Sequence, residues 1–122
     1  MKKRIINEIA RLASKKYQHD FILNGTKNSY VLPEEMIDAT CGTISTILGN
    51  EMLRKSLSIL QIDAIKKFEA EASEAYSTLP WDLITKDGEI LERPEWIHLR
   101  QCACECLQAF SVTVEEWEAS MK

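Results

Sequence analysis

The sequence predicts a mainly α-helical protein, a compact bundle of four to five helices with one or two short β-hairpins. Glycine and proline are scarce, at four and three of 122 residues, and apolar residues return at intervals of three and four along most of the chain. Residues 1–122 contain no repeat, linker or low-complexity tract. We therefore expect a single helical domain around one core.

Two helices and one turn are predicted in the first half. From about residue 3 to residue 18, apolar positions lie opposite a basic face, as in an amphipathic helix. Residues 21–32 predict a short hairpin or an ordered loop, because Asn24-Gly25 suits a tight two-residue turn. Pro33 and the two glutamates after it begin a helix that ends near residue 48, just before Gly49-Asn50.

The segment from residue 51 to residue 76 carries a long apolar stripe at helical spacing. An unbroken helix of this length would reach about 39 Å, which is long for so small a domain. Two isoleucines, Ile59 and Ile62, also lie off the stripe. We therefore predict a kink or a break around residues 61–63.

The last third predicts a hairpin and two helices. Apolar runs flank Lys86-Asp87-Gly88, so residues 81–91 are expected to form a two-stranded arm. Pro94 begins a helix that extends to about residue 110. Thr113 and Glu116 are spaced as a capping box for a last short helix.

Charge is distributed unevenly along the chain. Up to Gln61 there are nine Lys or Arg and six Asp or Glu. From Ile62 onward there are six Lys or Arg and thirteen Asp or Glu. An acidic surface repels phosphate backbones and attracts basic proteins. These counts disfavour nucleic acid as a partner and favour a basic protein partner, while a homo-oligomer stays open.

No diagnostic enzyme motif accompanies this charge pattern, neither a Walker loop, a dinucleotide-binding glycine pattern, a nucleophile elbow nor a metalloprotease helix. We expect a non-enzymatic protein without a cofactor, which occupies or bridges a basic partner as an immunity protein, antitoxin, phage-type inhibitor or adaptor does. The candidate docking surface is an apolar patch ringed by carboxylates: Trp81, Glu89, Glu92, Glu95, Ile97 and Glu105.

Three alternating cysteines lie in the predicted helix from residue 94 to residue 110. The helical pattern places Cys102 and Cys106 among core positions, where cysteine acts as a small hydrophobe. A second interpretation makes His98 and Cys102, one turn apart, two ligands of a zinc ion, completed by Cys106 or Cys41. His98 and Cys106 are about 12 Å apart along a helix, so they cannot share one ion.

Cys104 lies on the polar side of the same helix, near Arg100. A thiol beside a cation has a lowered pKa and is reactive. A thiol-dependent regulatory protein that uses His98, Cys102 and Cys104 is therefore a further alternative.

Arg93, four intervening residues and His98, within a small helical domain, resemble the Arg-x4-6-His signature of the HEPN ribonucleases. The likeness covers six residues. It implies that Arg93 would bind phosphate and stabilise the transition state, and that His98 would serve in acid-base catalysis. A ribonuclease is thus the alternative from the enzyme class.

The first residues contain no apolar stretch of the length that a signal peptide or a membrane span requires. We therefore expect a cytoplasmic protein with no membrane partner. In reducing cytosol, four cysteines are read as free thiols or ligands before disulfides.

Overall fold

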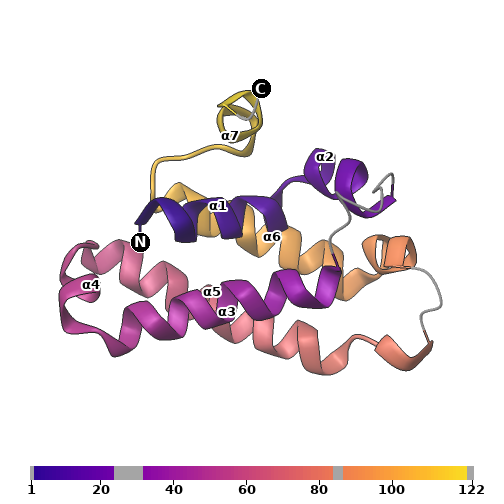
Figure 1. Cartoon of the computed structure of the whole chain (residues 1–122), viewed down its shortest axis with the longest axis horizontal. Coiled ribbons are helices and arrows are strands. Elements are labelled where there is room, and N and C mark those ends of the chain that lie inside the picture. The colour runs from indigo at the N-terminus through magenta and orange to yellow at the C-terminus, as the bar shows by residue number, and fades with distance from the viewer. Residues whose placement is uncertain (1, 24–31, 84–86, 121–122) are drawn as a thin grey trace.

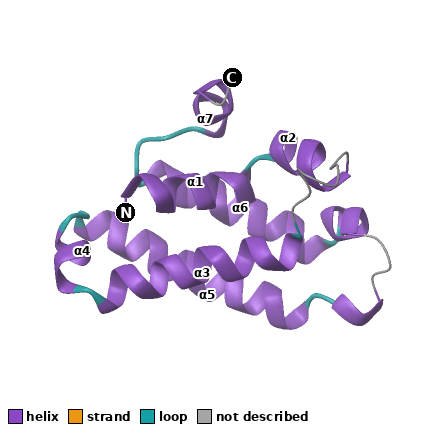
Figure 2. Ribbon diagram, in the orientation of Figure 1, coloured by secondary structure: helices purple, strands orange, loops and turns teal. Residues whose placement is uncertain are grey.

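The computed structural model describes residues 2–23, 32–83 and 87–120, and the regular structure within these ranges is entirely helical (Figures 1 and 2). It comprises a π-helical turn (His19–Leu23), two 3-10 helices (Trp81–Leu83 and Asp87–Glu92) and seven α-helices: α1 (Lys2–Ala13), α2 (Lys15–Gln18), α3 (Pro33–Gly49), α4 (Glu51–Lys55), α5 (Ile59–Thr78), α6 (Pro94–Gln108) and α7 (Val114–Ser120). None of the described helices is long and apolar enough to cross a membrane.

The four long helices form an antiparallel bundle. Helix α1 packs on α3 and α6, and α5 packs on the same two helices from the opposite side. Successive long helices run in opposite directions, as Figure 1 shows. The predicted mainly α architecture is confirmed, although the described ranges contain about seven α-helices instead of four or five.

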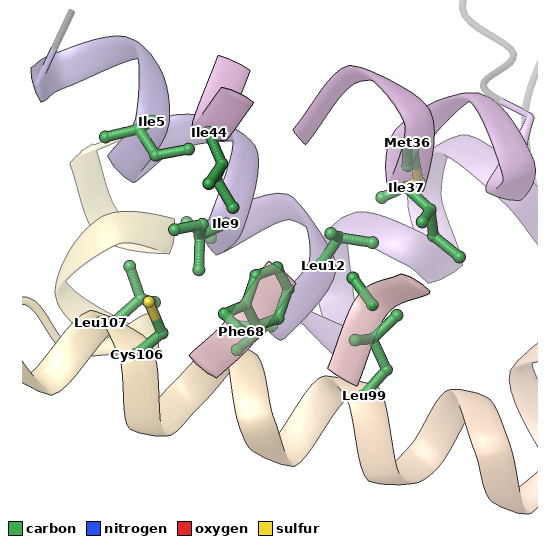
Figure 3. Close-up of a cluster of buried hydrophobic side chains, with 14 of the residues drawn as sticks. Ile5, Ile9, Leu12, Met36, Ile37, Ile44, Phe68, Leu99, Cys106 and Leu107 are labelled. Atoms are coloured by element: carbon green, nitrogen blue, oxygen red, sulfur yellow. The ribbon is translucent and has the colours of Figure 1, made fainter. Parts of the chain in front are cut away.

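The core follows the predicted apolar stripes. Ile5, Ile9 and Leu12 of α1 are at most 1% exposed. Phe68 of α5 lies between α1 and α6 in the labelled cluster, with Leu99 on one side of it (Figure 3). A helix with apolar residues at this spacing gains stability by burying one stripe, which is why the four stripes converge.

The break predicted in the 51–76 segment exists, but it lies at Ser56–Ser58 and not at residues 61–63. Ser58 and Gln61 form a capping box, since the Ser58 hydroxyl accepts the Gln61 N–H and the Gln61 side chain accepts the Ser58 N–H, each at 3.1 Å. The first helix is also divided, because Ser14 leaves the helical conformation and caps α2. Polar caps therefore decided where these helices begin.

The hairpin predicted at residues 81–91 is wrong for the described residues of that segment. Trp81–Leu83 and Asp87–Glu92 are 3-10 helices. Ile90 and Leu91 are adjacent and both buried, whereas a half-buried strand would alternate its sides. Local helical bonds and packing on the bundle end thus replace strand pairing.

The other predicted hairpin is only partly described. Phe21, Ile22 and Leu23 belong to the π-helical turn and not to a strand. Asn24-Gly25 and the residues up to Val31 lie outside the described ranges.

Candidate functional site

Helix α6 carries most of the residues singled out from the sequence. Pro94 is its first residue, and Arg93 precedes it in an extended conformation. Cys106 is buried, as the pattern predicts. Cys102 is half-buried instead, because it lies at the seam where α6 packs against α5.

The predicted docking residues are distributed over three elements: Trp81 on the 3-10 helix Trp81–Leu83, Glu89 and Glu92 on the 3-10 helix Asp87–Glu92, and Glu95, Ile97 and Glu105 on α6. Ile97 is 38% exposed, and Glu89, Glu92 and Glu105 are exposed, whereas Glu95 is half-buried. Glu95 and Glu105 are ten positions apart on α6, which separates them by about 15 Å along the helix axis.

Trp81 differs from its predicted role as an exposed anchor. Its side chain is half-buried against the core, and its ring centroid lies 5.6 Å from that of Tyr76. The indole N–H donates to the Tyr76 carbonyl at 2.8 Å. Part of its apolar surface is therefore already used within the chain.

Among the described residues, the most exposed large apolar side chains lie elsewhere, on α4 and at the start of α5. Met52 is 83% exposed, Ile59 82% and Leu60 68%. We call these three residues the apolar corner. Ile59 and Leu60 are the first two residues of α5, directly after the capping box, so the cap that starts the helix also presents them to solvent.

Charged groups beside the apolar corner are engaged within the chain. Lys55 Nζ lies 3.0 Å from Glu51 Oε1, one turn away on α4. The Arg54 guanidinium donates to the Leu48 carbonyl at 3.1 Å. Glu51 and Lys55 balance each other, whereas Arg54 donates to a neutral carbonyl and keeps its positive charge beside the apolar corner.

A second constellation lies on the seam between α5 and α6. Within residues 2–23, 32–83 and 87–120, the one group of three or more His, Cys, Asp or Glu side chains with metal-ligand spacing is Glu71, His98 and Cys102. His98 Nε2 is 3.0 Å from Glu71 Oε2 and 3.5 Å from Cys102 Sγ, and all three ligand atoms lie within 4.8 Å of one another. We call this group the seam cluster.

The seam cluster is accessible to solvent and has acidic side chains around its thiol. The His98 side chain is 63% exposed and that of Glu71 31%. Burial raises the pKa of the Cys102 thiol, and the charges of Glu71 and Glu105 raise it further, against a lowering by Lys67. The two nearby carboxylates, and not the burial, are the part of this environment that would attract a cation.

Shallow hollows flank the seam cluster on both sides. One, of about 110 Å³, is lined by Glu71, Cys102 and Glu105, together with Lys67. The other, of about 140 Å³, is lined by Glu71 and His98, with further carboxylates from Glu74 and Glu95. Glu71 borders both hollows, so the cluster can be reached from solvent along the seam.

The remaining cysteines do not join this cluster. Cys106 is buried, and burial raises its pKa to about 12. Cys41 lies on α3, where burial and the charges of Glu69 and Asp38 raise its pKa. Among the described residues, neither Cys41 nor Cys106 belongs to the group of ligand atoms around His98 and Cys102, so their expected role in completing a zinc site is wrong; Glu71 is the third member of that group.

Cys104 is not the activated thiol expected from its place beside Arg100. It is half-buried, and burial raises its pKa more than the Arg100 charge lowers it. Its Sγ lies 3.9 Å from the Ala13 carbonyl of α1. Cys104 thus packs toward α1 instead of facing solvent as a reactive group.

Arg93 and His98, the two residues that carry the HEPN resemblance, each contact a different glutamate. The Arg93 guanidinium lies 3.6 Å from Glu95, while His98 contacts Glu71. Five residues of helix turn the chain by about 140° beyond a full turn, so positions 93 and 98 project in different directions. The ribonuclease stays a prediction.

Glu71 is the residue that sequence reasoning missed. Its carboxylate belongs to a series with Glu69 and Glu74 that is typical of a solvated helix face. An antiparallel pairing of the helices before and after residues 81–92 was the signal that would have placed it opposite His98 and Cys102.

Comparisons with family models, with curated proteins and with solved structures gave no match for this chain.

Proposed function

We propose that the chain is a small cytoplasmic protein-binding module that occupies the surface of a basic protein partner. The observation that carries this proposal is the apolar corner. Met52 of α4 and Ile59 and Leu60 at the start of α5 are large side chains that are more than two-thirds exposed. Exposed apolar side chains of this size are more typical of interaction sites than of the rest of a protein surface.

The apolar corner supplies the burial that binding requires. Removing one Met, Ile or Leu side chain from water is worth about 1.5–3 kcal/mol. Three such side chains provide a central anchor for an interface, and weaker polar contacts around them exclude water. Because Glu51 and Lys55 pair with each other within the chain, docking beside them leaves neither of these two charges unpaired.

Long-range charge supplies the direction of approach. The net charge is −4, and the half of the chain from Ile62 onward carries thirteen acidic against six basic residues. Exposed carboxylates such as Glu92, just before α6, and Glu105, on α6, contribute to this acidic field. Such a field steers a positively charged partner and raises the rate of encounter, with a strong dependence on salt.

The test compares the wild-type chain with the double variant Ile59→Asp/Leu60→Asp as bait in host lysate, with bound proteins quantified by mass spectrometry. Both positions are exposed, so the variant should fold, which circular dichroism checks. The matched control is Ser73→Asp/Ser77→Asp, which adds the same charge at exposed positions farther along α5. Size-exclusion chromatography of each purified protein measures self-association.

A basic protein that binds in stoichiometric amount to the wild type and to the control, but is lost with the corner variant and weakened by salt, supports the proposal. The proposal is overturned if wild type and corner variant retain the same proteins. It is also overturned if the apolar corner serves only self-association, seen as an oligomer that the variant converts to monomer.

A further inference from the structure

We propose that Glu71, His98 and Cys102 form a binding site for a thiophilic divalent transition-metal ion of the zinc class, at the seam between α5 and α6. The three residues contribute one carboxylate oxygen, one imidazole nitrogen and one sulfur. This site is separate from the apolar corner and does not depend on the proposed partner.

Spacing of the ligand atoms fits a tetrahedral ion. Zinc binds nitrogen and oxygen at about 2.0–2.1 Å and thiolate sulfur at about 2.3 Å, so tetrahedral ligands are separated by about 3.3 Å for nitrogen and oxygen and about 3.5 Å for nitrogen and sulfur. The corresponding distances here are 3.0 Å from His98 Nε2 to Glu71 Oε2 and 3.5 Å from His98 Nε2 to Cys102 Sγ. Small rotations of the Glu71 and His98 side chains open room for the ion.

The backbone holds these groups in register. His98 and Cys102 are four residues apart on α6, so they project from one face about 6 Å apart along the axis. Glu71 approaches from α5, which packs tightly on α6 along this seam. An ion bound here cross-links two helices of the bundle that belong to different parts of the chain.

The electrostatic surroundings favour a cation. Glu105 acts on Cys102 from the next turn of α6, and Glu74 and Glu95 line the hollow beside His98. Lys67 is the opposing charge that acts on the thiol. Binding replaces the thiol proton with the metal, so Cys102 becomes a thiolate bound to the ion and one proton enters solvent.

The donor set selects the kind of ion. A thiolate and an imidazole prefer zinc, cobalt, nickel or copper, whereas calcium and magnesium require sets of oxygen ligands. Three protein ligands on an exposed seam leave the fourth tetrahedral position to water. The site is thus expected to bind zinc and to exclude magnesium.

The test measures zinc affinity of the purified, reduced full-length chain by competition with a chromophoric chelator, and records the spectrum of the cobalt form. The ligand variants are Cys102→Ser, His98→Gln and Glu71→Gln. Matched controls are Cys104→Ser, a half-buried cysteine on the same helix, and Glu74→Gln, an exposed glutamate on the same helix as Glu71. Circular dichroism of the metal-free proteins checks that each variant folds.

We expect one zinc ion per chain, and a loss of at least about tenfold in affinity for each ligand variant, since even removal of a group that only supports a metal ligand costs that much. The sulfur-to-cobalt charge-transfer band should vanish in Cys102→Ser and persist in Cys104→Ser. Affinity should fall on acidification from about pH 8 to about pH 6, because protons compete for the thiolate.

Several outcomes overturn the inference. They are the absence of stoichiometric zinc, an equal loss of affinity in Cys104→Ser and Cys102→Ser, and full competition by magnesium. None of them bears on the apolar corner, so failure here leaves the proposed function intact.

Discussion

Gln18 offers the sharpest test of how the bundle is held together. It is a polar residue with no exposed surface, and its amide makes five hydrogen bonds. The Nε2 group donates to the Arg11 and Leu12 carbonyls near the end of α1, at 3.1 and 2.9 Å. The Oε1 atom accepts from the Trp96 indole at 3.0 Å and from both Nε and Nη2 of Arg100. Gln18 thus joins the end of α1 to α6.

Replacement of Gln18 by Met keeps the length of the side chain and removes all five bonds. Trp96 is 1% exposed, and the bond to Leu12 is buried, so the indole N–H and the Leu12 carbonyl lose their partners away from water. Each orphaned group costs about 1–3 kcal/mol, which gives a loss of about 2–6 kcal/mol. Arg100 is half-exposed and can turn to solvent, so it adds little.

The measurement is urea unfolding followed by circular dichroism at equilibrium, with Lys16→Met as the control at an exposed position nearby. A double-mutant cycle with Trp96→Phe isolates one bond, because phenylalanine lacks the N–H that Gln18 accepts. In that background Gln18→Met should cost about 1 kcal/mol less. A loss below about 0.5 kcal/mol for Gln18→Met, equal to that of a surface change, would refute this account.

Two further predictions concern a helix cap and a buried thiol. Ser58→Ala removes the capping box of α5 and should lower the free energy of unfolding, measured in urea, by about 1 kcal/mol. Ser77→Ala, at an exposed position in the same helix, should change it little. Equal effects of the two substitutions would contradict the stabilising role of the cap. The pKa of Cys106 is raised from 9.0 to about 12 in the folded chain, so above pH 9 the unfolded state loses a proton that the folded state keeps. The free energy of unfolding should therefore fall by up to about 1.4 kcal/mol per pH unit between pH 9 and pH 12. In Cys106→Ala, under reducing conditions, the dependence of this free energy on pH should be weaker by the contribution of one proton. An unchanged dependence on pH would show that this thiol does not contribute.

The positions of the long helices were accessible from sequence because each carries its own signals. Pro33 and Pro94 begin α3 and α6 where expected, and Thr113 with Glu116 caps the last helix, since the Glu116 N–H donates to the Thr113 hydroxyl at 3.1 Å. The 81–91 segment failed for the opposite reason. Its turn-like residues are compatible with both a hairpin and 3-10 turns, and packing on the bundle decided between them.

Periodicity, proline and capping residues act within a few positions along the chain, and they determined the mainly helical class, the stripes that form the core and the ends of α3 and α6. Which helix lies beside which was decided only in three dimensions. The burial of Gln18, the approach of Glu71 to His98 and Cys102, and the packing of Cys104 toward α1 all depend on contacts between residues far apart in sequence. Local pattern carries no information on such pairs, because their energy exists only once the helices have packed.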